Sequence, residues 1–114
     1  MHIDFYEFGK ICIDNNCYSS DVIIFPDLMT DHWWRQQGHN LAVEDLNEVL
    51  QYRPQVLVIG TGYYGRMNIP EQTKQHIEQQ GISLIALPTS DAVNELNRLQ
   101  AQCVNAVGAF HLTC

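Results

Sequence analysis

Short continuous apolar runs mark three strands in the second half of the chain. QVLVIG (55–60) and ISLIALP (82–88) are apolar almost throughout, which is typical of strands buried on both faces of a sheet. VNAVGAFHLTC (104–114) closes the chain as a further strand. We expect 55–60 and 82–88 to be adjacent, parallel and almost fully buried.

Apolar residues at helical spacing precede and separate these runs. Such stripes lie in 43–53 and in 90–103, and a sparser one lies in 68–81, where Asn68 and Glu71 have the spacing of a capping box. The inward positions of the first and last stripes are Val43, Leu46, Val49 and Leu50, and then Ala92, Val93, Leu96, Leu99 and Cys103. The β-α-β-α-β order predicts an α/β fold with a mostly parallel sheet covered by helices.

The first quarter of the chain indicates β-structure. KICIDNNCY (10–18) alternates before its polar centre, and asparagine tolerates positive φ, so we expect a tight hairpin turn around Asn15 and Asn16. DVIIF (21–25) is a third strand. Residues 26–42 show no regular period, which predicts a long connection, and long loops in small domains are often functional.

Composition narrows the class of protein. The 114 residues suit a single domain spanning 1–114, and 46% hydrophobic with 17% charged residues is a globular composition. Thirteen acidic residues against six basic ones give a formal charge of −7, which repels nucleic acid and anionic membranes. No apolar run approaches the ~20 residues that cross a bilayer. We therefore expect no nucleic-acid or membrane partner.

Four cysteines, Cys12, Cys17, Cys103 and Cys114, bear on the cellular compartment. None forms a CxxC pair, so neither a zinc knuckle nor a thioredoxin motif is present. No secretory signal is visible, so we expect four reduced thiols in a cytoplasmic protein. Cys12 and Cys17 would be near diagonal neighbours across the hairpin, and we expect no disulfide between them.

Gly60, Gly62 and Gly65 have the spacing of a dinucleotide-binding loop. Such a loop needs a helix that opens at the glycines and an acid roughly 20 residues on. Capping signals place the helix past Gly65, and Asp91 lies beyond the next strand, while no lysine follows as in a P-loop. The glycines are therefore interpreted as a sharp exit from a buried strand, and no cofactor is expected.

A crevice for a small molecule at this strand end stays open as an alternative, because open α/β sheets bind ligands at such places. Its candidate residues are Thr61, Gly62, Tyr63 and Arg66. Arg66 would then hold an anion through charge-assisted hydrogen bonds.

Aromatic and basic residues gather in the long connection. Trp33, Trp34, Arg35 and His39 are a candidate interaction surface, since exposed tryptophan and arginine are common hot spots. The alternative is that tryptophan rings cover the edge of the core and Arg35 stacks on one of them. We favour this alternative for at least one tryptophan, because neighbours in an extended segment point in opposite directions.

The closing HLTC offers a histidine and a cysteine three residues apart. In one strand His111 and Cys114 would lie on opposite faces, which disfavours a shared metal or a catalytic pair. No Ser/His/Asp arrangement or HExxH motif is visible. We therefore expect no metal site and no catalytic residues.

With these pieces in place, the chain resembles the Mth938-like domain family of small domains of unknown function. The matching pieces, in order, are YEFGKICID, DVIIFPD, WWRQQGHNLAVEDL, VLVIGTGYYG, GISLIALPTSDAVNELNRL and HLTC. The family includes an animal protein associated with adipogenesis and a mitochondrial assembly factor of respiratory complex I. The resemblance implies a three-layer α/β fold with a central mixed sheet and an N-terminal β-hairpin layer, and it implies no established activity or cofactor.

Two functional hypotheses follow. The first is a non-enzymatic binding or assembly-type domain that acts through contacts with an unknown protein partner. The second is a binder of a small anionic molecule, or an undiscovered enzyme, that uses the crevice at the Gly60–Arg66 loop.

Overall fold

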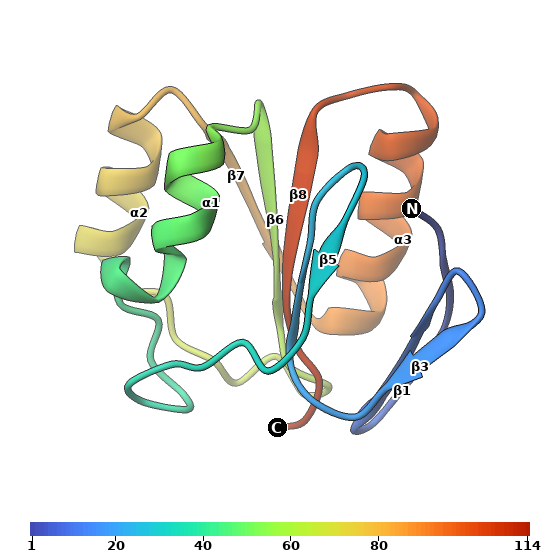
Figure 1. The fold of residues 1–114 in the computed structure, drawn as a ribbon. Coiled ribbons are helices and arrows are strands. Elements are labelled where there is room, and N and C mark those ends of the chain that lie inside the picture. The colour runs from blue at the N-terminus through green and yellow to red at the C-terminus, as the bar shows by residue number, and fades with distance from the viewer.

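A computed structural model describes residues 1–114 as one α/β unit (Figure 1). The elements in chain order are β1 Ile3–Glu7, β2 Lys10–Ile13, β3 Asn16–Tyr18, β4 Val22–Ile24, β5 Met29–Thr30, the 3-10 helix η1 Val43–Leu46, α1 Asn47–Tyr52, β6 Val56–Thr61, α2 Glu71–Gln79, β7 Ser83–Leu87, α3 Thr89–Ala101 and β8 Ala106–His111. None of the helices is long and apolar enough to cross a membrane.

The strands form two sheets. β1, β2 and β3 make an antiparallel sheet in that order, and the other five strands have the order β5-β4-β8-β6-β7. In the larger sheet β6 pairs in parallel with β7 and with β8, whereas β4 pairs antiparallel with β5 and β8. A mixed α/β fold is therefore confirmed. The expectation of a mostly parallel sheet is not, because the segment before the first helix supplies two antiparallel strands.

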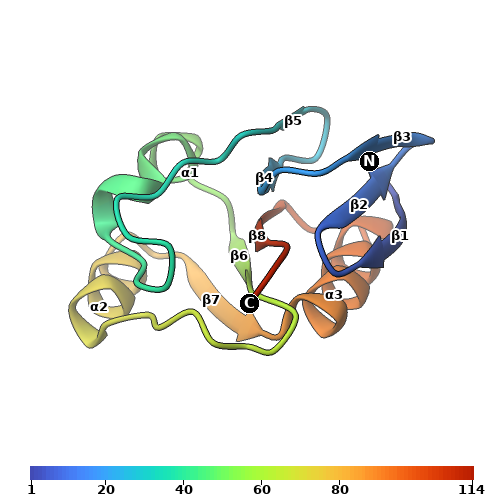
Figure 2. The ribbon, with the colours of Figure 1, turned by 90° about the horizontal axis from the view of Figure 1, so that it is seen from below.

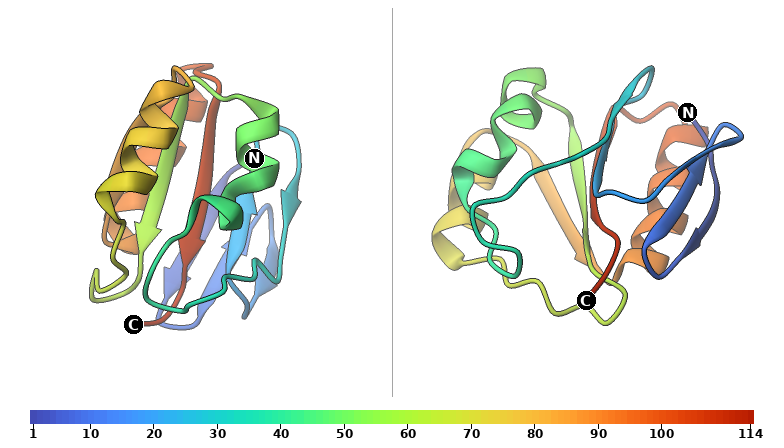
Figure 3. Two further views of the ribbon diagram at one scale, coloured as in Figure 1. Left: turned by 90° about the vertical axis from the view of Figure 1, so that its left-hand side faces the viewer. Right: turned by 60° about the horizontal axis from the view of Figure 1, so that its bottom comes forward.

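Helices cover both faces of the larger sheet. α1 and α2 lie on one face, while α3 and the three-stranded sheet lie on the other (Figures 2 and 3). The alternation of side chains along each strand produces two cores. Leu57 and Ile59 of β6 pack with Ile77 of α2 on the first face, whereas Val58 packs with Leu96 of α3 on the second.

The small sheet, made of β1, β2 and β3, is hydrogen-bonded to α3 through the side chain of Asn97. Asn97 accepts a hydrogen bond from the Ile3 N–H and donates one to the Ile3 carbonyl, both at 2.9 Å. These two bonds use the backbone groups of β1 that its antiparallel partner leaves free. The hairpin therefore covers the second core instead of projecting into solvent.

Both strands of the expected parallel pair are present and adjacent, but they differ in burial. β6 is buried from Leu57 to Thr61, whereas β7 has Ser83 and Ala86 exposed and its other three residues half-buried. The expectation of nearly full burial is wrong for 82–88. The reason is topological, because β7 is the last strand of the sheet and has no neighbour on its outer side.

Two helix boundaries also differ from expectation. α2 begins at Glu71, and Asn68 makes no capping bond to it; its side-chain amide instead donates to Asn40 Oδ1 at 3.0 Å. α3 ends at Ala101, so Cys103, expected to face inward, is exposed with a φ of +62°.

The expectation of four free cysteines is wrong. Cys12 and Cys17 form a disulfide, with an S–S distance of 2.02 Å, while Cys103 and Cys114 are free. The hairpin turn is Asp14–Asn15, both with positive φ, one residue earlier than expected. That shift places Cys12 directly opposite Cys17 rather than diagonal to it.

Alkylation under denaturing conditions without reductant should therefore label two cysteines per chain, Cys103 and Cys114. Prior reduction should raise the count to four. Intact-mass spectrometry measures both counts, and four labels on the unreduced protein would contradict the disulfide.

Candidate functional site

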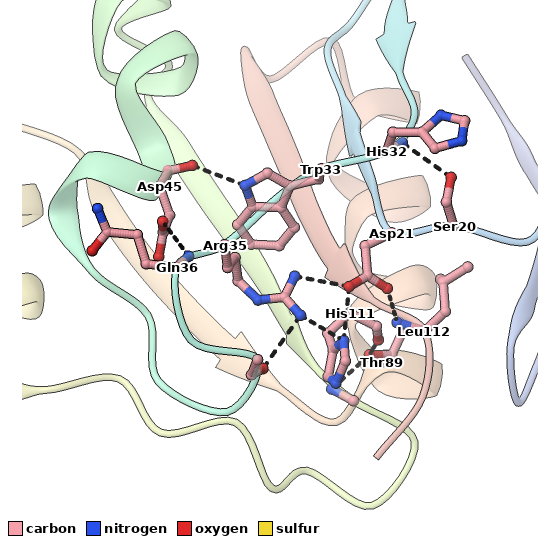
Figure 4. Close-up of polar contacts among 12 residues, drawn as sticks. Ser20, Asp21, His32, Trp33, Arg35, Gln36, Asp45, Thr89, His111 and Leu112 are labelled. Carbon is pink, nitrogen blue, oxygen red and sulfur yellow. Dashed lines mark hydrogen bonds and ion pairs between the residues drawn. The ribbon is translucent and has the colours of Figure 1, made fainter.

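Three segments far apart in sequence meet at the carboxyl end of β8. β4 pairs antiparallel with β8, with Val22 opposite Phe110. Asp21, just before Val22, therefore comes to lie beside His111, the last residue of β8. Arg35 reaches the same point from the long connection (Figure 4). We call Asp21, Arg35 and His111 the charged cluster.

The Asp21 carboxylate is the centre of the charged cluster. Its Oδ2 lies 2.8 Å from Arg35 Nη1 and 2.9 Å from His111 Nδ1. Its Oδ1 accepts a hydrogen bond of 2.8 Å from the Leu112 N–H. The two carboxylate oxygens therefore join β4, β8 and the long connection.

All three side chains are withdrawn from water. The exposed fraction is 4% for Arg35, 8% for His111 and 18% for Asp21. Burial raises the pKa of the Asp21 carboxyl, but the hydrogen bonds from His111 and the Leu112 N–H, with the charge of Arg35, outweigh it. The pKa therefore lies below its ordinary value, and Asp21 is the anion that balances the buried guanidinium.

The chemistry of His111 follows from its Nδ1 neighbours. Nδ1 lies 2.9 Å from both Asp21 Oδ2 and Arg35 Nη2, and a proton on Nδ1 lets the ring donate to the carboxylate. Arg35 Nη2 then donates to the Gly38 carbonyl at 3.3 Å. The other ring nitrogen, Nε2, is buried without a hydrogen-bond partner. An Asp–His pair of this kind orients a base in some enzymes. In this structure no side chain forms a hydrogen bond with His111 Nε2.

The charged cluster orders the segment around the two tryptophans. Arg35 Cζ lies 4.7 Å from the centre of the Trp33 ring, and Trp33 Nε1 donates to the Asp45 carbonyl at 2.8 Å. Trp33 and Arg35 are consequently buried, whereas Trp34 between them is 74% exposed. The expected stacking of Arg35 on a tryptophan at the core edge is confirmed.

The four residues of the expected interaction surface thus separate into two pairs. Trp33 and Arg35 face inward, and Trp34 and His39 face solvent. The exposed His39 ring stands perpendicular to the His111 ring with centres 6.1 Å apart.

Backbone N–H groups of the glycine loop, residues 60–66, form hydrogen bonds within the protein. The Gly62 N–H donates to Thr89 Oγ1 at 2.9 Å, and the Tyr63 N–H donates to the Thr113 carbonyl at 2.9 Å. The Gly65 N–H returns to the Gly62 carbonyl at 3.1 Å. Three of the donors that a dinucleotide loop would aim at phosphates are therefore already used, and Thr61 is buried.

The exposed part of this loop is aromatic and basic. Tyr63 and Tyr64 stack edge to face at 5.0 Å, and both approach Phe8 of the β1–β2 turn. Arg66 Cζ lies 5.1 Å from the centre of the Tyr64 ring and has no carboxylate partner. Of the candidate crevice residues with polar side chains, Tyr63 and Arg66 face solvent and Thr61 does not.

Tyr6 of β1 contacts the glycine loop, with its ring centre 6.3 Å from that of Tyr63. Its hydroxyl donates to the Leu112 carbonyl at 2.8 Å. Burial is the main cause that raises the pKa of Tyr6 to about 12, and Tyr63 and Asp21 add to it against a hydrogen bond with Thr89.

The ionisation of Tyr6 should be visible at high pH. The folded pKa lies above the unfolded value of about 10, so the stability from neutral Tyr6 is complete below pH ~10 and is lost as the pH rises through about 12. The ultraviolet difference titration between wild type and Tyr6→Phe should show a phenolate that forms near pH 12. A midpoint near 10 would mean that the hydroxyl is solvated.

Sequence reasoning found the members of the charged cluster only in part. The sequence pattern places Arg35 in a candidate interaction surface and considers His111 together with Cys114 as a possible pair, but it does not single out Asp21. β8 ends at His111, so Cys114 lies outside the strand. The one signal for Asp21 in the sequence is its position, because it is a charged residue directly before the apolar strand 22–25.

Comparison with known proteins identifies the family. A family model described as protein of unknown function (DUF498/DUF598) matches residues 3–111. The conserved hypothetical protein PH1505 of Pyrococcus horikoshii is 26% identical with a TM-score of 0.84, over 100% of both chains. The structure named MT938 is 21% identical with a TM-score of 0.80, over 99% of this chain and 98% of that one.

A third structure carries the name of the fold. A protein of Bordetella pertussis, described as a Mth938-like domain, is 19% identical with a TM-score of 0.76. The match covers 97% of this chain and 85% of that one. This chain therefore belongs to the DUF498 family of proteins of unknown function and is a Mth938-like domain.

Proposed function

We propose that this protein is a non-enzymatic binding or assembly-type domain that acts through protein contacts, with Trp34 as its anchor. The observation that carries the proposal is the 74% exposure of Trp34 between two buried, bonded neighbours. A tryptophan on a fixed segment loses little conformational freedom on binding. Tryptophan is also among the residues most enriched in interface hot spots.

The surroundings of Trp34 favour a basic partner. A cavity of about 390 Å³ beside it is lined by four acidic residues, Asp31, Glu44, Asp45 and Glu48, and no lysine or arginine lines it. The Asp45 carboxylate accepts hydrogen bonds from the Gln36 and Ala42 N–H groups. Glu44 and Glu48 lie four residues apart and have no basic partner. Both line the same cavity, so a lysine or arginine of a partner that enters it would reduce the repulsion between their charges.

The test is capture of binding proteins from a lysate of the source organism by the immobilised chain. A specific partner should be retained by wild type and lost by Trp34→Ala, since a hot-spot loss of ~2 kcal/mol weakens binding about 30-fold. Retention should fall as salt screens the acidic surface. Phe5→Ala, which removes another exposed aromatic, is the matched control and should bind normally. Equal capture by wild type and Trp34→Ala would refute the proposal.

A second candidate is an anionic small-molecule binder or undiscovered enzyme at the glycine loop. The exposed, unpaired Arg66 beside Tyr63 and Tyr64 favours it. The ligand would contact these side chains, because the Gly62 N–H is bonded to Thr89.

Thermal denaturation with NAD, NADP, ATP or FAD distinguishes the two candidates. We expect no shift, whereas a ligand at one hundred times its dissociation constant would add ~2.7 kcal/mol. A shift that Arg66→Ala abolishes would favour the second candidate. The same variant should leave the capture of a protein partner at Trp34 unchanged.

A further inference from the structure

The outer edge of β7 is the feature that the proposed function does not use. β7 ends the five-stranded sheet and pairs only with β6. Seen from below, it lies between α2 and α3 with no helix or strand on its outer side (Figure 2). The opposite edge of the sheet is β5, which has only two residues.

The direction of the free backbone groups is fixed by the pairing with β6. The Ser83 N–H donates to the Gln55 carbonyl at 3.0 Å, so Ser83 faces β6. Residues of a parallel strand alternate between their two neighbours, so Ile85 also faces β6. Leu84 and Ala86 therefore direct one N–H and one C=O each away from the sheet. Two donors and two acceptors line this edge.

This edge lacks the features that normally prevent strand pairing. Natural edge strands carry charges, prolines or bulges, or are covered by other elements. GISLIAL (81–87) contains no charged residue and no proline, and the register between β6 and β7 has no irregularity. The chain carries a net charge of −7, yet none of that charge lies on this strand.

We propose that β7 pairs with β7 of a second copy of this chain across a two-fold axis at Ile85. In this antiparallel register Leu84 lies opposite Ala86 of the second copy, and each such pair exchanges two hydrogen bonds. The two pairs together use all four outward groups of each copy. The five-stranded sheet then continues as one sheet through the dimer.

The side chains support this register. Leu84 is half-buried against the α1–α2 core, and Ile85 and Leu87 are half-buried against the α3 core. The register places the large Leu84 beside the small Ala86, and Ile85 beside its own copy. Each contact removes further apolar surface from water. The strand itself brings no charge to the contact between the two acidic molecules.

The oligomeric state of the full chain tests the proposal. Analytical ultracentrifugation from micromolar to millimolar concentration should show a monomer–dimer equilibrium, with more dimer at high ionic strength because salt screens the charge of both copies. Ala86→Pro removes an outward N–H and none of the bonds to β6, which is where proline is tolerated in a strand. The loss of two intermolecular hydrogen bonds should raise the dimer dissociation constant ~30-fold. Ser19→Lys, on an exposed residue after β3, is the control and should dimerise normally.

Hydrogen exchange in the wild type gives a readout that needs no variant. The Leu84 and Ala86 amides should exchange slowly in concentrated samples and quickly after dilution. The Ile85 amide, bonded to β6, should be protected at both concentrations. A wild type that stays monomeric to millimolar concentration, or an Ala86→Pro variant that dimerises equally well, would overturn the proposal. An edge occupied only by a different protein would do the same.

Discussion

Asp21→Ala is expected to lower the free energy of unfolding by about 3–5 kcal/mol, which is the usual cost of removing one partner of a buried ion pair. The variant leaves the Arg35 guanidinium, 4% exposed, without its carboxylate. It also leaves the Leu112 N–H without its acceptor. Urea denaturation at neutral pH measures the change. Asp27→Ala, at an exposed carboxylate with no ion-pair partner, should change stability by less than about 0.5 kcal/mol.

Two further measurements separate the charged cluster from general packing. Asp21→Ala combined with Arg35→Met should recover part of the loss, because no unpaired charge then remains buried. Because the pKa of Asp21 is lowered on folding, its contribution is complete above the unfolded value of about 3.9 and is lost as the pH falls through the folded value. The gap between wild type and Asp21→Ala should therefore narrow in acid. A gap that is small at pH 7 would mean that the cluster does not stabilise the fold.

Gly62→Ala should be almost as damaging, with an expected loss of roughly 2–5 kcal/mol, the sum of a backbone cost and a packing cost. Gly62 has a φ of +107°, where an alanine costs ~1–2 kcal/mol. An added Cβ would also lie 2.5 Å from the Cys114 backbone carbon and 2.6 Å from the Thr113 oxygen, and such overpacking costs about 1–3 kcal/mol more. Chemical denaturation measures the sum.

Gly81→Ala is the matched control for Gly62→Ala. Gly81 also has a positive φ, +80°, but an added Cβ there meets nothing within 4 Å. Its loss should therefore be limited to the backbone cost of ~1–2 kcal/mol. Equal losses in the two variants would show that the approach of Thr113 and Cys114 to the glycine loop is not tight.

The close packing around Gly62 also explains why the sequence has the glycine spacing of a dinucleotide-binding loop. Gly62 is a glycine because the backbone of 113–114 passes where a side chain would be. Gly60 has a similar reason, since its Cβ would lie 2.8 Å from Thr89 Oγ1. The spacing that resembles a nucleotide loop thus serves close packing at the ends of β6 and β8.

The sequence by itself determined the order of the elements and the buried strands at the centre of the sheet. Leu57, Ile59 and Val107 belong to continuous apolar runs, and Leu96 and Leu99 recur at helical spacing, so the local pattern predicts both their structure and their burial. The parallel contact between β6 and β7 followed from the crossover connection through α2. The interpretation of the glycines as a turn rather than a nucleotide loop also followed, because the delayed start of α2 is visible in the sequence.

The tertiary structure alone decided the register, the sheet edge and the charged cluster. Cys12 and Cys17 form a disulfide because the hairpin turn lies one residue earlier than expected and places them directly opposite each other. Local sequence propensity does not locate a turn to within one residue. ISLIALP has the pattern of a central strand, yet the strand order leaves it at the edge. His111 contacts Asp21, which lies 90 positions earlier in the sequence, and Arg35, which lies 76 positions earlier. Contacts over such separations depend on how strands and loops are arranged in space, and periodicity along the chain carries no information about that arrangement.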